Sequence, residues 1–209
     1  MKRFALSIFC AGLLFTGASS TFAQSDKKPE FFGGYSFENV DSGITSTDLG
    51  TTTTLDNRFN ANGINLAVTG YLTRRFGITG DFSGQWKTRD DVIGTSSAQS
   101  KFALYNITGG PQFRFMSSSR VTPFVHALAG VARRNLTETV AGTPFSDDKT
   151  SFALNLGGGV DYRLSKRFAW RLFQLDYNPI FLQQRTVNLI DVPSHTLNGF
   201  RFSTGIVIK

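Results

Sequence analysis

Apolar and polar residues alternate along most of the chain with a period of two, the spacing that puts successive side chains on opposite faces of a β-strand. After residue 24, no segment keeps the 3.6-residue apolar period of an amphipathic helix. The alternation is clearest over residues 152–164, where the even positions are mostly bulky and apolar while Asn155, Asp161 and Arg163 occupy odd positions. The pattern predicts eight strands, at residues 31–39, 60–72, 76–87, 100–115, 121–134, 152–164, 168–177 and 196–208.

Short and long connections alternate between these strands. Three are tight, at residues 73–75, 116–120 and 165–167, and four are long and polar, at residues 40–57, 88–99, 135–150 and 178–195. Strands of about 9–11 residues, with tight turns at one end and long loops at the other, are typical of a transmembrane barrel. The barrel has to be closed, because an open edge leaves amides unpaired in lipid. The sequence therefore predicts an all-β fold, an eight-stranded antiparallel up-and-down transmembrane β-barrel.

Two residues interrupt the alternation. Pro111 lies within the fourth strand and cannot donate to the ladder, so we expect a bulge or a loss of pairing there. Arg171 falls at an apolar position of the seventh strand, which predicts a bulge near Leu172 or an arginine at the membrane interface. The fifth strand has apolar residues on both faces, so its facing stays open.

The first 23 residues have the composition of a secretory signal peptide. Lys2 and Arg3 precede an apolar run of about a dozen residues, too short to span a bilayer as a helix, and a small-residue cleavage site ends at Ala23. We expect a signal peptide at 1–23, one barrel domain at 24–209, and both termini of the mature chain in the periplasm. The single cysteine, Cys10, follows Phe9, which a lipoprotein signal does not allow. The mature chain therefore has no thiol for a disulfide or a metal.

The charge changes this prediction little. The chain has 22 Lys and Arg against 15 Asp and Glu, a formal charge of +7, and loss of Lys2 and Arg3 leaves 7 − 2 = +5. The bases are scattered, so we expect no nucleic-acid partner. Within the tight turns they are concentrated, because Arg74, Arg75, Arg120, Lys166 and Arg167 lie there without an acid.

Several short motifs resemble the small outer-membrane β-barrel family of OmpA/OmpX type. They are Phe32-Gly33-Gly34-Tyr35-Ser36, Gly157-Gly158-Gly159-Val160-Asp161-Tyr162, Phe173-Gln174-Leu175-Asp176-Tyr177 and the closing strand from Phe200 to Ile208. The likeness covers nearly all of the mature chain. It implies a bacterial outer-membrane barrel among outer-membrane lipids, inserted by the barrel-assembly machinery. Family members usually end in an aromatic residue, whereas this chain ends in Lys209.

Candidate chemistry is sparse. The two histidines, His126 and His195, are too few for a zinc site, so we expect no metal and no cofactor. Some barrels of this kind are lipid A deacylases with a His-x-Ser pair, but Leu128 and Leu197 stand where the serine is needed. Gly157-Gly158-Gly159 lacks the Gly-Lys-Ser/Thr ending of a phosphate loop. We therefore expect no catalysis.

The polar faces carry charges of both signs, which should lie inside the barrel. Such charges are costly to desolvate alone, so we expect them to pair across the lumen or to hold water, as a structural network. The predicted set is Glu38, Asp81, Lys87, Arg114, Asp161, Arg163, Asp176 and Arg201.

These observations favour a structural or surface-interaction role for a monomer with a filled lumen and long outward loops that contact an unknown surface partner. A narrow solute or ion channel is the first alternative. The second is a soluble lipocalin-like carrier of an apolar ligand, also eight-stranded, which buries its apolar side chains inside. The small residues of the polar face suit a tight lumen and favour the membrane protein.

Overall fold

A computed structural model describes residues 28–41, 45–48, 51–54, 58–93, 96–115, 120–140, 143–182, 185–187, 190–192 and 195–209. The predicted signal peptide lies outside these residues, as does most of the predicted turn at 116–120. Among the described residues, no helix is long and apolar enough to cross a membrane.

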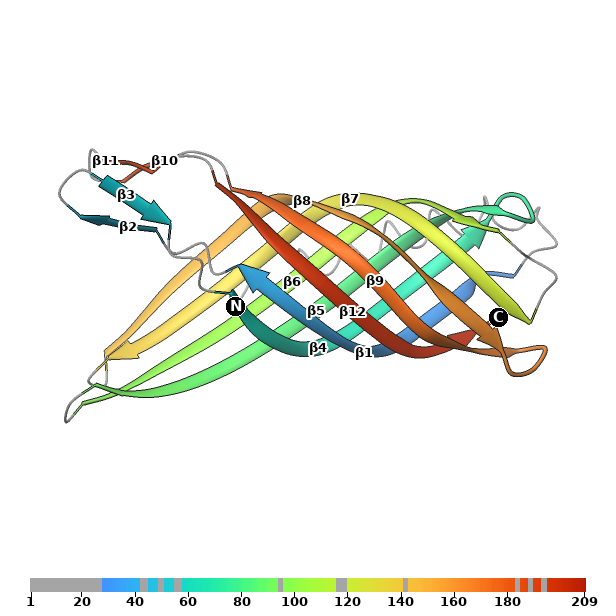
Figure 1. Ribbon diagram of the computed structural model, residues 1–209, viewed down its shortest axis with the longest axis horizontal. Helices are drawn as coiled ribbons and strands as arrows, with labels where there is room; N and C mark the ends of the chain where they lie inside the picture. The colour runs from blue at the N-terminus through green and yellow to red at the C-terminus, as the bar shows by residue number, and fades with distance from the viewer. Residues whose placement is uncertain are drawn as a thin grey trace, which may run out of the picture.

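Eight long antiparallel strands close into a barrel, so the predicted fold is confirmed (Figure 1). Their order around the wall is β1-β12-β9-β8-β7-β6-β5-β4, in which β1 closes the ring against β12. The strands are β1 (Glu30–Asp41), β4 (Arg58–Tyr71), β5 (Phe76–Ile93), β6 (Ser96–Arg114), β7 (Val121–Val140), β8 (Thr143–Arg163), β9 (Phe168–Leu182) and β12 (His195–Ile208). Two small hairpins lie between them in sequence, β2 (Thr45–Asp48) with β3 (Thr51–Thr54) and β10 (Arg185–Val187) with β11 (Ile190–Val192).

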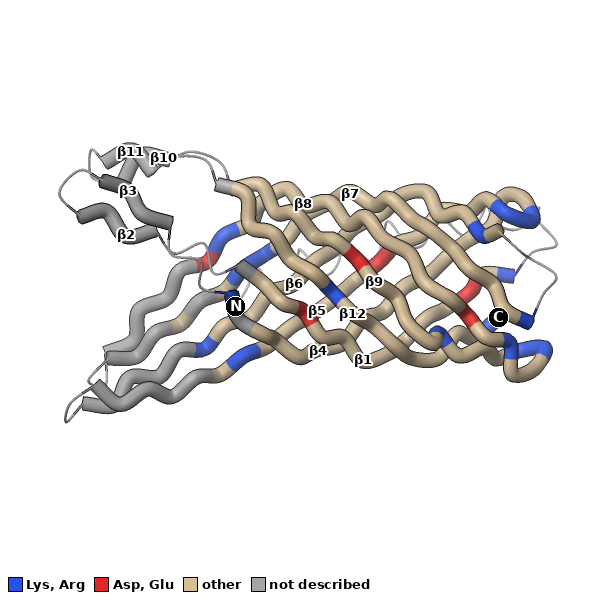
Figure 2. Tube along the Cα trace, viewed as in Figure 1, with Lys and Arg blue, Asp and Glu red and all other residues tan. Residues whose placement is uncertain are grey.

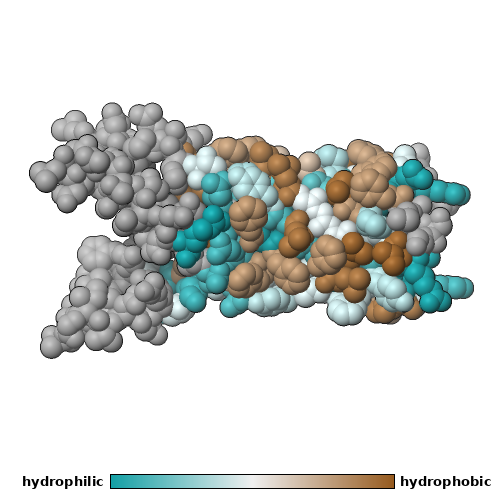
Figure 3. Space-filling view, in the orientation of Figure 1, coloured by the Kyte–Doolittle hydropathy of each residue, from teal (hydrophilic) through white to brown (hydrophobic). Residues whose placement is uncertain are grey.

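The apolar face of the barrel points outward. Large apolar side chains with 37% or more of their surface exposed occur on all eight strands, for example Phe31, Leu66, Ile107 and Leu175. Brown apolar patches accordingly cover much of the barrel wall in Figure 3. The carrier alternative predicts the reverse arrangement, so the structure contradicts it. In the fifth strand, now β7, Phe124 and Leu128 are buried at 3% and 1% exposure, while Val125 and Val131 are exposed.

The height of this apolar belt matches a bilayer. On β5 the outward residues run from Phe76 at the tight turn to Trp86. These positions are about ten residues apart, and at ~3.4 Å per residue and a tilt of about 45° they span about 24 Å, close to the ~25 Å apolar band of outer-membrane barrels. At the outer edge of the belt, Trp86 Nε1 donates a hydrogen bond to the Tyr105 hydroxyl at 3.0 Å.

A bulge in β9 explains why Arg171 breaks the alternation. Gln174 and Phe173 pair with Ser203 and Val160, but beyond Leu172 the register shifts on both sides, so that Arg171 pairs with Gly205 and Asp161. Leu172 is therefore the extra residue, and it turns Arg171 into the lumen, where 4% of its surface is exposed. The predicted bulge near Leu172 is confirmed.

Pro111 has a milder effect than a bulge. It pairs with Ile78 in the unbroken register of β5 and β6. Towards β7 the ladder stops at Gly109 and resumes at Gln112 without a change of register. Of the two predicted outcomes, only the loss of pairing is found.

The segments predicted as long loops are mostly strand, which corrects the prediction. β5 continues to Ile93 and β6 begins at Ser96, while β7 continues to Val140 and β8 begins at Thr143. Figure 1 shows these two strand pairs running far along one end of the barrel. Beyond the membrane both faces of a strand pair can meet water, so the sequence need not alternate and the period-two signal disappears.

Candidate functional site: the barrel lumen

Contacts between strands that are not neighbours in the wall define the lumen, because such side chains can meet only through the interior. Arg201 of β12 contacts Asp81 of β5, although β1 and β4 separate these strands in the wall. Asn178 of β9 donates a hydrogen bond to Glu38 of β1 at 3.0 Å, past β12. The polar face is therefore the inner face.

Arg201 is the centre of a buried charge network. Its Nη1 lies 3.0 Å from Asp81 Oδ1, and its Nη2 lies 2.7 Å from Asp176 Oδ2. All three side chains are at most 1% exposed. A desolvated charge is stable in such a place only when an opposite charge and hydrogen bonds compensate it. One guanidinium here compensates two carboxylates. Figure 2 shows acidic and basic positions on the strands between the two ends of the barrel.

The network continues toward the tight-turn end through hydrogen bonds. Gln174 Nε2 donates to Asp176 Oδ2 at 2.7 Å, and Arg171 Nη1 donates to Gln174 Oε1 at 2.6 Å. Arg171 Nε then donates to Asp161 Oδ1 at 2.8 Å. A continuous path of charged and amide groups thus leads from Asp161 on β8 to Asp81 on β5.

Glycine 157 makes room for this network. A Cβ built on Gly157 would lie 2.1 Å from Asp176 Oδ1 and 2.3 Å from the Leu175 carbonyl oxygen. Any side chain at this position would displace the carboxylate that Arg201 contacts. The absence of a side chain at Gly157 thus permits the close packing of the network.

Aromatic rings hold Arg171 from both sides. The guanidinium carbon lies 4.2 Å from the centroid of the Phe32 ring and 4.3 Å from that of Phe124. These rings come from β1 and β7, on opposite sides of β9. Cation–π contacts of this kind are stronger when the partners are desolvated, so the rings fix the arginine in its pair with Asp161.

Apolar layers lie on both sides of the charged network. The outer layer consists of Val40, Leu104, Ala132, Ala153, Ile180 and Leu197, each no more than 4% exposed. A smaller layer of Phe32, Ala169 and Val207 lies on the tight-turn side. The network and these layers are all buried, and an ion pair in such surroundings is stronger and more costly to break than one in water.

The eight predicted lumen residues occupy three different environments. Glu38, Asp81, Asp161, Asp176 and Arg201 are buried, with 5% or less of their surface exposed.

The other three lie nearer the ends. Arg114 pairs with Glu30 at 3.0 Å at the tight-turn mouth, and Arg163 is half-buried beside a cavity there. Lys87 is exposed, which corrects its predicted place in the lumen. Trp86 marks the outer edge of the apolar belt, so the next inward position of β5 already meets water.

The barrel matches a known family of outer-membrane proteins. The sequence profile of a family described as the outer membrane protein beta-barrel domain matches residues 8–185. The chain belongs to this family. It is therefore a protein of the bacterial outer membrane, and the apolar belt is its lipid-facing surface.

Solved structures of outer-membrane barrels show the same fold. Ail of Yersinia pestis, crystallised with the heparin analogue sucrose octasulfate, has a TM-score of 0.54 at 18% identity, covering 86% of this chain and 97% of Ail. The Neisserial surface protein A has a TM-score of 0.55 at 15% identity, covering 88% and 99%. No curated protein matches the chain.

Among the residues that the structure describes, the histidine–carboxylate pair is His126 with Asp176, and it is buried. His126 Nε2 lies 2.9 Å from Asp176 Oδ1, with the two side chains 2% and 0% exposed. A general base must come within hydrogen-bond reach of its substrate, which this position does not allow. Among the described residues, no group of three or more His, Cys, Asp and Glu side chains could hold a metal ion. The side chain of His195 lies outside the described residues.

The charge set predicted from the sequence left out several members of the lumen contacts, among them Glu30, His126, Arg171 and Gln174. Parity along the strand was enough to find Gln174, which follows the same inward positions as Asp176. Arg171 points inward only because of the bulge at Leu172, and the sequence left an arginine at the membrane interface as the alternative. His126 and Glu30 make their contacts across the barrel, and the strand pattern has no information on which inward residues meet.

Proposed function

We propose that this barrel is a structural, non-conducting outer-membrane protein that presents strand pairs beyond the bilayer to a surface partner, and that it catalyses no reaction. The observation that carries the proposal is the length of β7 and β8, which have 20 and 21 residues and stay paired from Val121 to Val140. Crossing the membrane takes only about 9–11 residues per strand. About half of this strand pair is therefore available outside the lipid.

The lumen supports the same role. The buried network around Arg201 and the buried outer apolar layer lie inside the wall, where a solute would have to pass, and they support a filled lumen. Eight strands leave an interior that side chains can just fill. A filled interior favours a stable barrel that presents strand pairs at the cell surface over a narrow solute or ion channel.

We further propose that the tight-turn end faces the periplasm, that the barrel-assembly machinery inserts the chain as a monomer, and that residues 1–23 are removed as a signal peptide. Mass spectrometry of the protein purified from outer membranes should give a mature chain beginning at Gln24. A precursor that keeps its first residues would contradict the last part of this proposal.

Shortening the β7–β8 strand pair tests the surface role. Leu136 and Asp147 are partners in the ladder, so an Asn-Gly turn between them replaces residues 137–146 without changing the register. Asp90 and Gln99 permit the matched shortening of β5–β6. We expect cells that carry either shortened barrel to lose part of their adhesion to other cells and to matrix-coated surfaces, with the barrel still folded. Unchanged adhesion of both variants would contradict the proposal.

A further inference from the structure

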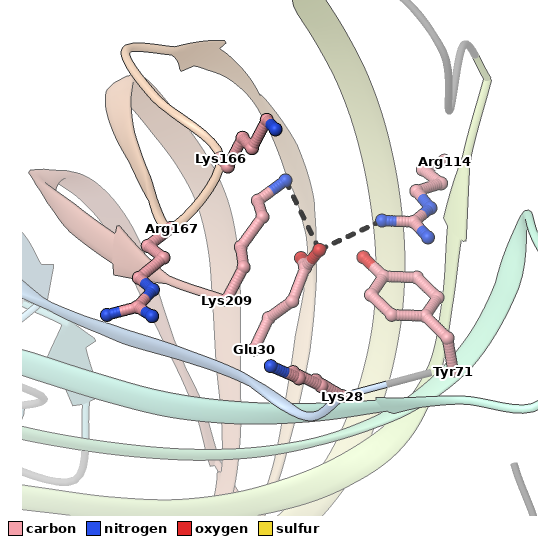
Figure 4. Close-up of a pocket in the computed structure, with 7 residues that line it drawn as sticks. All are labelled: Lys28, Glu30, Tyr71, Arg114, Lys166, Arg167 and Lys209. Atoms are coloured by element: carbon pink, nitrogen blue, oxygen red, sulfur yellow. Dashed lines mark hydrogen bonds and ion pairs between the residues drawn. The ribbon is translucent and has the colours of Figure 1, made fainter. Parts of the chain in front are cut away.

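A basic cavity opens at the tight-turn mouth of the barrel (Figure 4). It has a volume of about 340 Å³ and is lined by Lys28, Glu30, Tyr71, Arg114, Lys166, Arg167 and Lys209. Five of these seven side chains are cationic, and only Glu30 is acidic. They come from the first and last described residues of the chain, from strand ends and from the turn between β8 and β9, so the fold brings distant parts of the sequence together here.

Glu30 compensates only two of the cations. Its Oε1 lies 3.0 Å from Arg114 Nη1 and 3.2 Å from Lys209 Nζ. The side chains of Lys28, Lys166 and Arg167 also line the cavity, and no dashed line joins them to Glu30 in Figure 4. Within the described part of the chain, these three side chains have no ion pair. The cavity therefore keeps an excess of positive charge.

Contacts between buried and half-buried side chains hold the floor of the cavity in place. The Arg114 guanidinium carbon lies 3.7 Å from the centroid of the Tyr71 ring, and Arg114 Nε donates a hydrogen bond to the Arg74 carbonyl at 2.7 Å. The Tyr71 hydroxyl accepts a hydrogen bond from Gln112 Nε2 at 2.8 Å, which leaves its own proton for another acceptor. Tyr71 is 4% exposed and Gln112 3%. Donors held in place in this way bind an anion with little loss of side-chain entropy.

We propose that this cavity binds a phosphate group. A compact oxyanion with several acceptor atoms suits a cluster of ammonium and guanidinium donors, because hydrogen bonds between charged partners are the stronger ones. The cavity lies at the end of the apolar belt, where phospholipid headgroups lie, and it also opens to water. The phosphate can therefore belong to an anionic phospholipid headgroup or to a soluble phosphate, and the experiment below separates these sources.

The test compares two double substitutions at the same end of the barrel. Lys166→Gln with Arg167→Gln removes two cations that line the cavity. Arg74→Gln with Arg75→Gln removes two exposed cations from another tight turn, outside the lining residues, and is the matched control. The native barrel is titrated with inorganic phosphate in a maltoside detergent, and amide chemical shifts of Lys209 and Arg114 are followed. In a second arm, nanodiscs of phosphatidylcholine are compared with nanodiscs that also contain phosphatidylglycerol.

We expect saturable shifts for the native barrel, an apparent Kd raised about tenfold by the substitutions in the cavity, and a change of about twofold or less in the control. Shifts with phosphatidylglycerol identify a headgroup as the source, and shifts with inorganic phosphate alone identify a soluble anion; either result supports the site. Equal weakening in both variants would show diffuse attraction by the rim, and it would overturn the proposal. Absence of saturable shifts in both arms would overturn it too.

Discussion

Arg201 is the residue on which the buried charge of the lumen depends most. Arg201→Ala removes the guanidinium that lies within ion-pair distance of both Asp81 and Asp176, whose side chains are 1% and 0% exposed. We expect the free energy of unfolding to fall by about 3–5 kcal/mol, the cost of leaving a buried partner uncompensated. Urea unfolding of the barrel in lipid vesicles measures the change.

Arg163 provides the comparison for this prediction. It has the same charge but is half-buried beside the mouth cavity, where water can replace its contacts. Arg163→Ala should therefore cost about 1 kcal/mol or less. If the two substitutions had equal effects on unfolding, the lumen network would not be the buried unit described above.

Arginine substitutions at two depths, one within β4 and one in the turn after it, test whether the outward face of the barrel contacts lipid. Leu66 is 47% exposed near the middle of β4, and Leu72 is 54% exposed in the turn that follows. Arginine at the midplane of a barrel costs about 2–4 kcal/mol, and at the interface about 0–1 kcal/mol. Leu66→Arg should therefore impair folding into vesicles far more than Leu72→Arg. Losses of the same size would argue against a bilayer around the belt.

The sequence predicted whether a side chain points inward or outward wherever its odd or even position along the strand (its parity) decides this. Parity placed Glu38, Asp81 and Asp176 inside, because each alternates with bulky apolar neighbours. It failed for Lys87, since alternation says nothing about the height at which the barrel opens to water. It also could not pair Asp81 with Arg201, because this contact crosses the lumen between strands that are distant in the wall.

Among the strands, β9 gives the sharpest prediction because its bulge is a single extra residue. Deleting Leu172 would make the ladders with β8 and β12 regular and would leave Arg171 inside. Deleting Leu175, an outward residue of the regular ladder, would reverse the faces of one part of the strand. We expect the first variant to insert and the second to fail. Folding is measured by the shift in gel migration between boiled and unboiled samples.

The opposite result for these deletions would be informative as well. Failure of the Leu172 deletion together with insertion of the Leu175 deletion would contradict the assigned register of β9.

The strand pairs outside the membrane could not be predicted from alternating apolar and polar residues. There the faces of β7 and β8 lack the lipid that imposes alternation, so the pattern ended although the pairing continues to Val140.

As a whole molecule, the chain forms a lipid-facing cylinder with a charged, apolar-capped interior and a basic mouth. The sequence predicted the closed eight-stranded wall, because a bilayer allows no other arrangement of so many alternating strands. It did not predict the apolar layers above and below the network. Leu104 and Leu197 lie at inward positions that the alternation assigns to polar residues, so only their shared height in the barrel makes them a layer.

The conductance of the native barrel in a planar lipid bilayer tests most directly whether the lumen is closed to ions and solutes. In the proposed function, the network around Arg201 closes the path for solutes together with the outer layer of Val40, Leu104, Ala132, Ala153, Ile180 and Leu197. We expect little or no stable conductance from inserted, folded protein. Large, steady, ion-selective currents from the unmodified protein would contradict it and would make a narrow channel the better description.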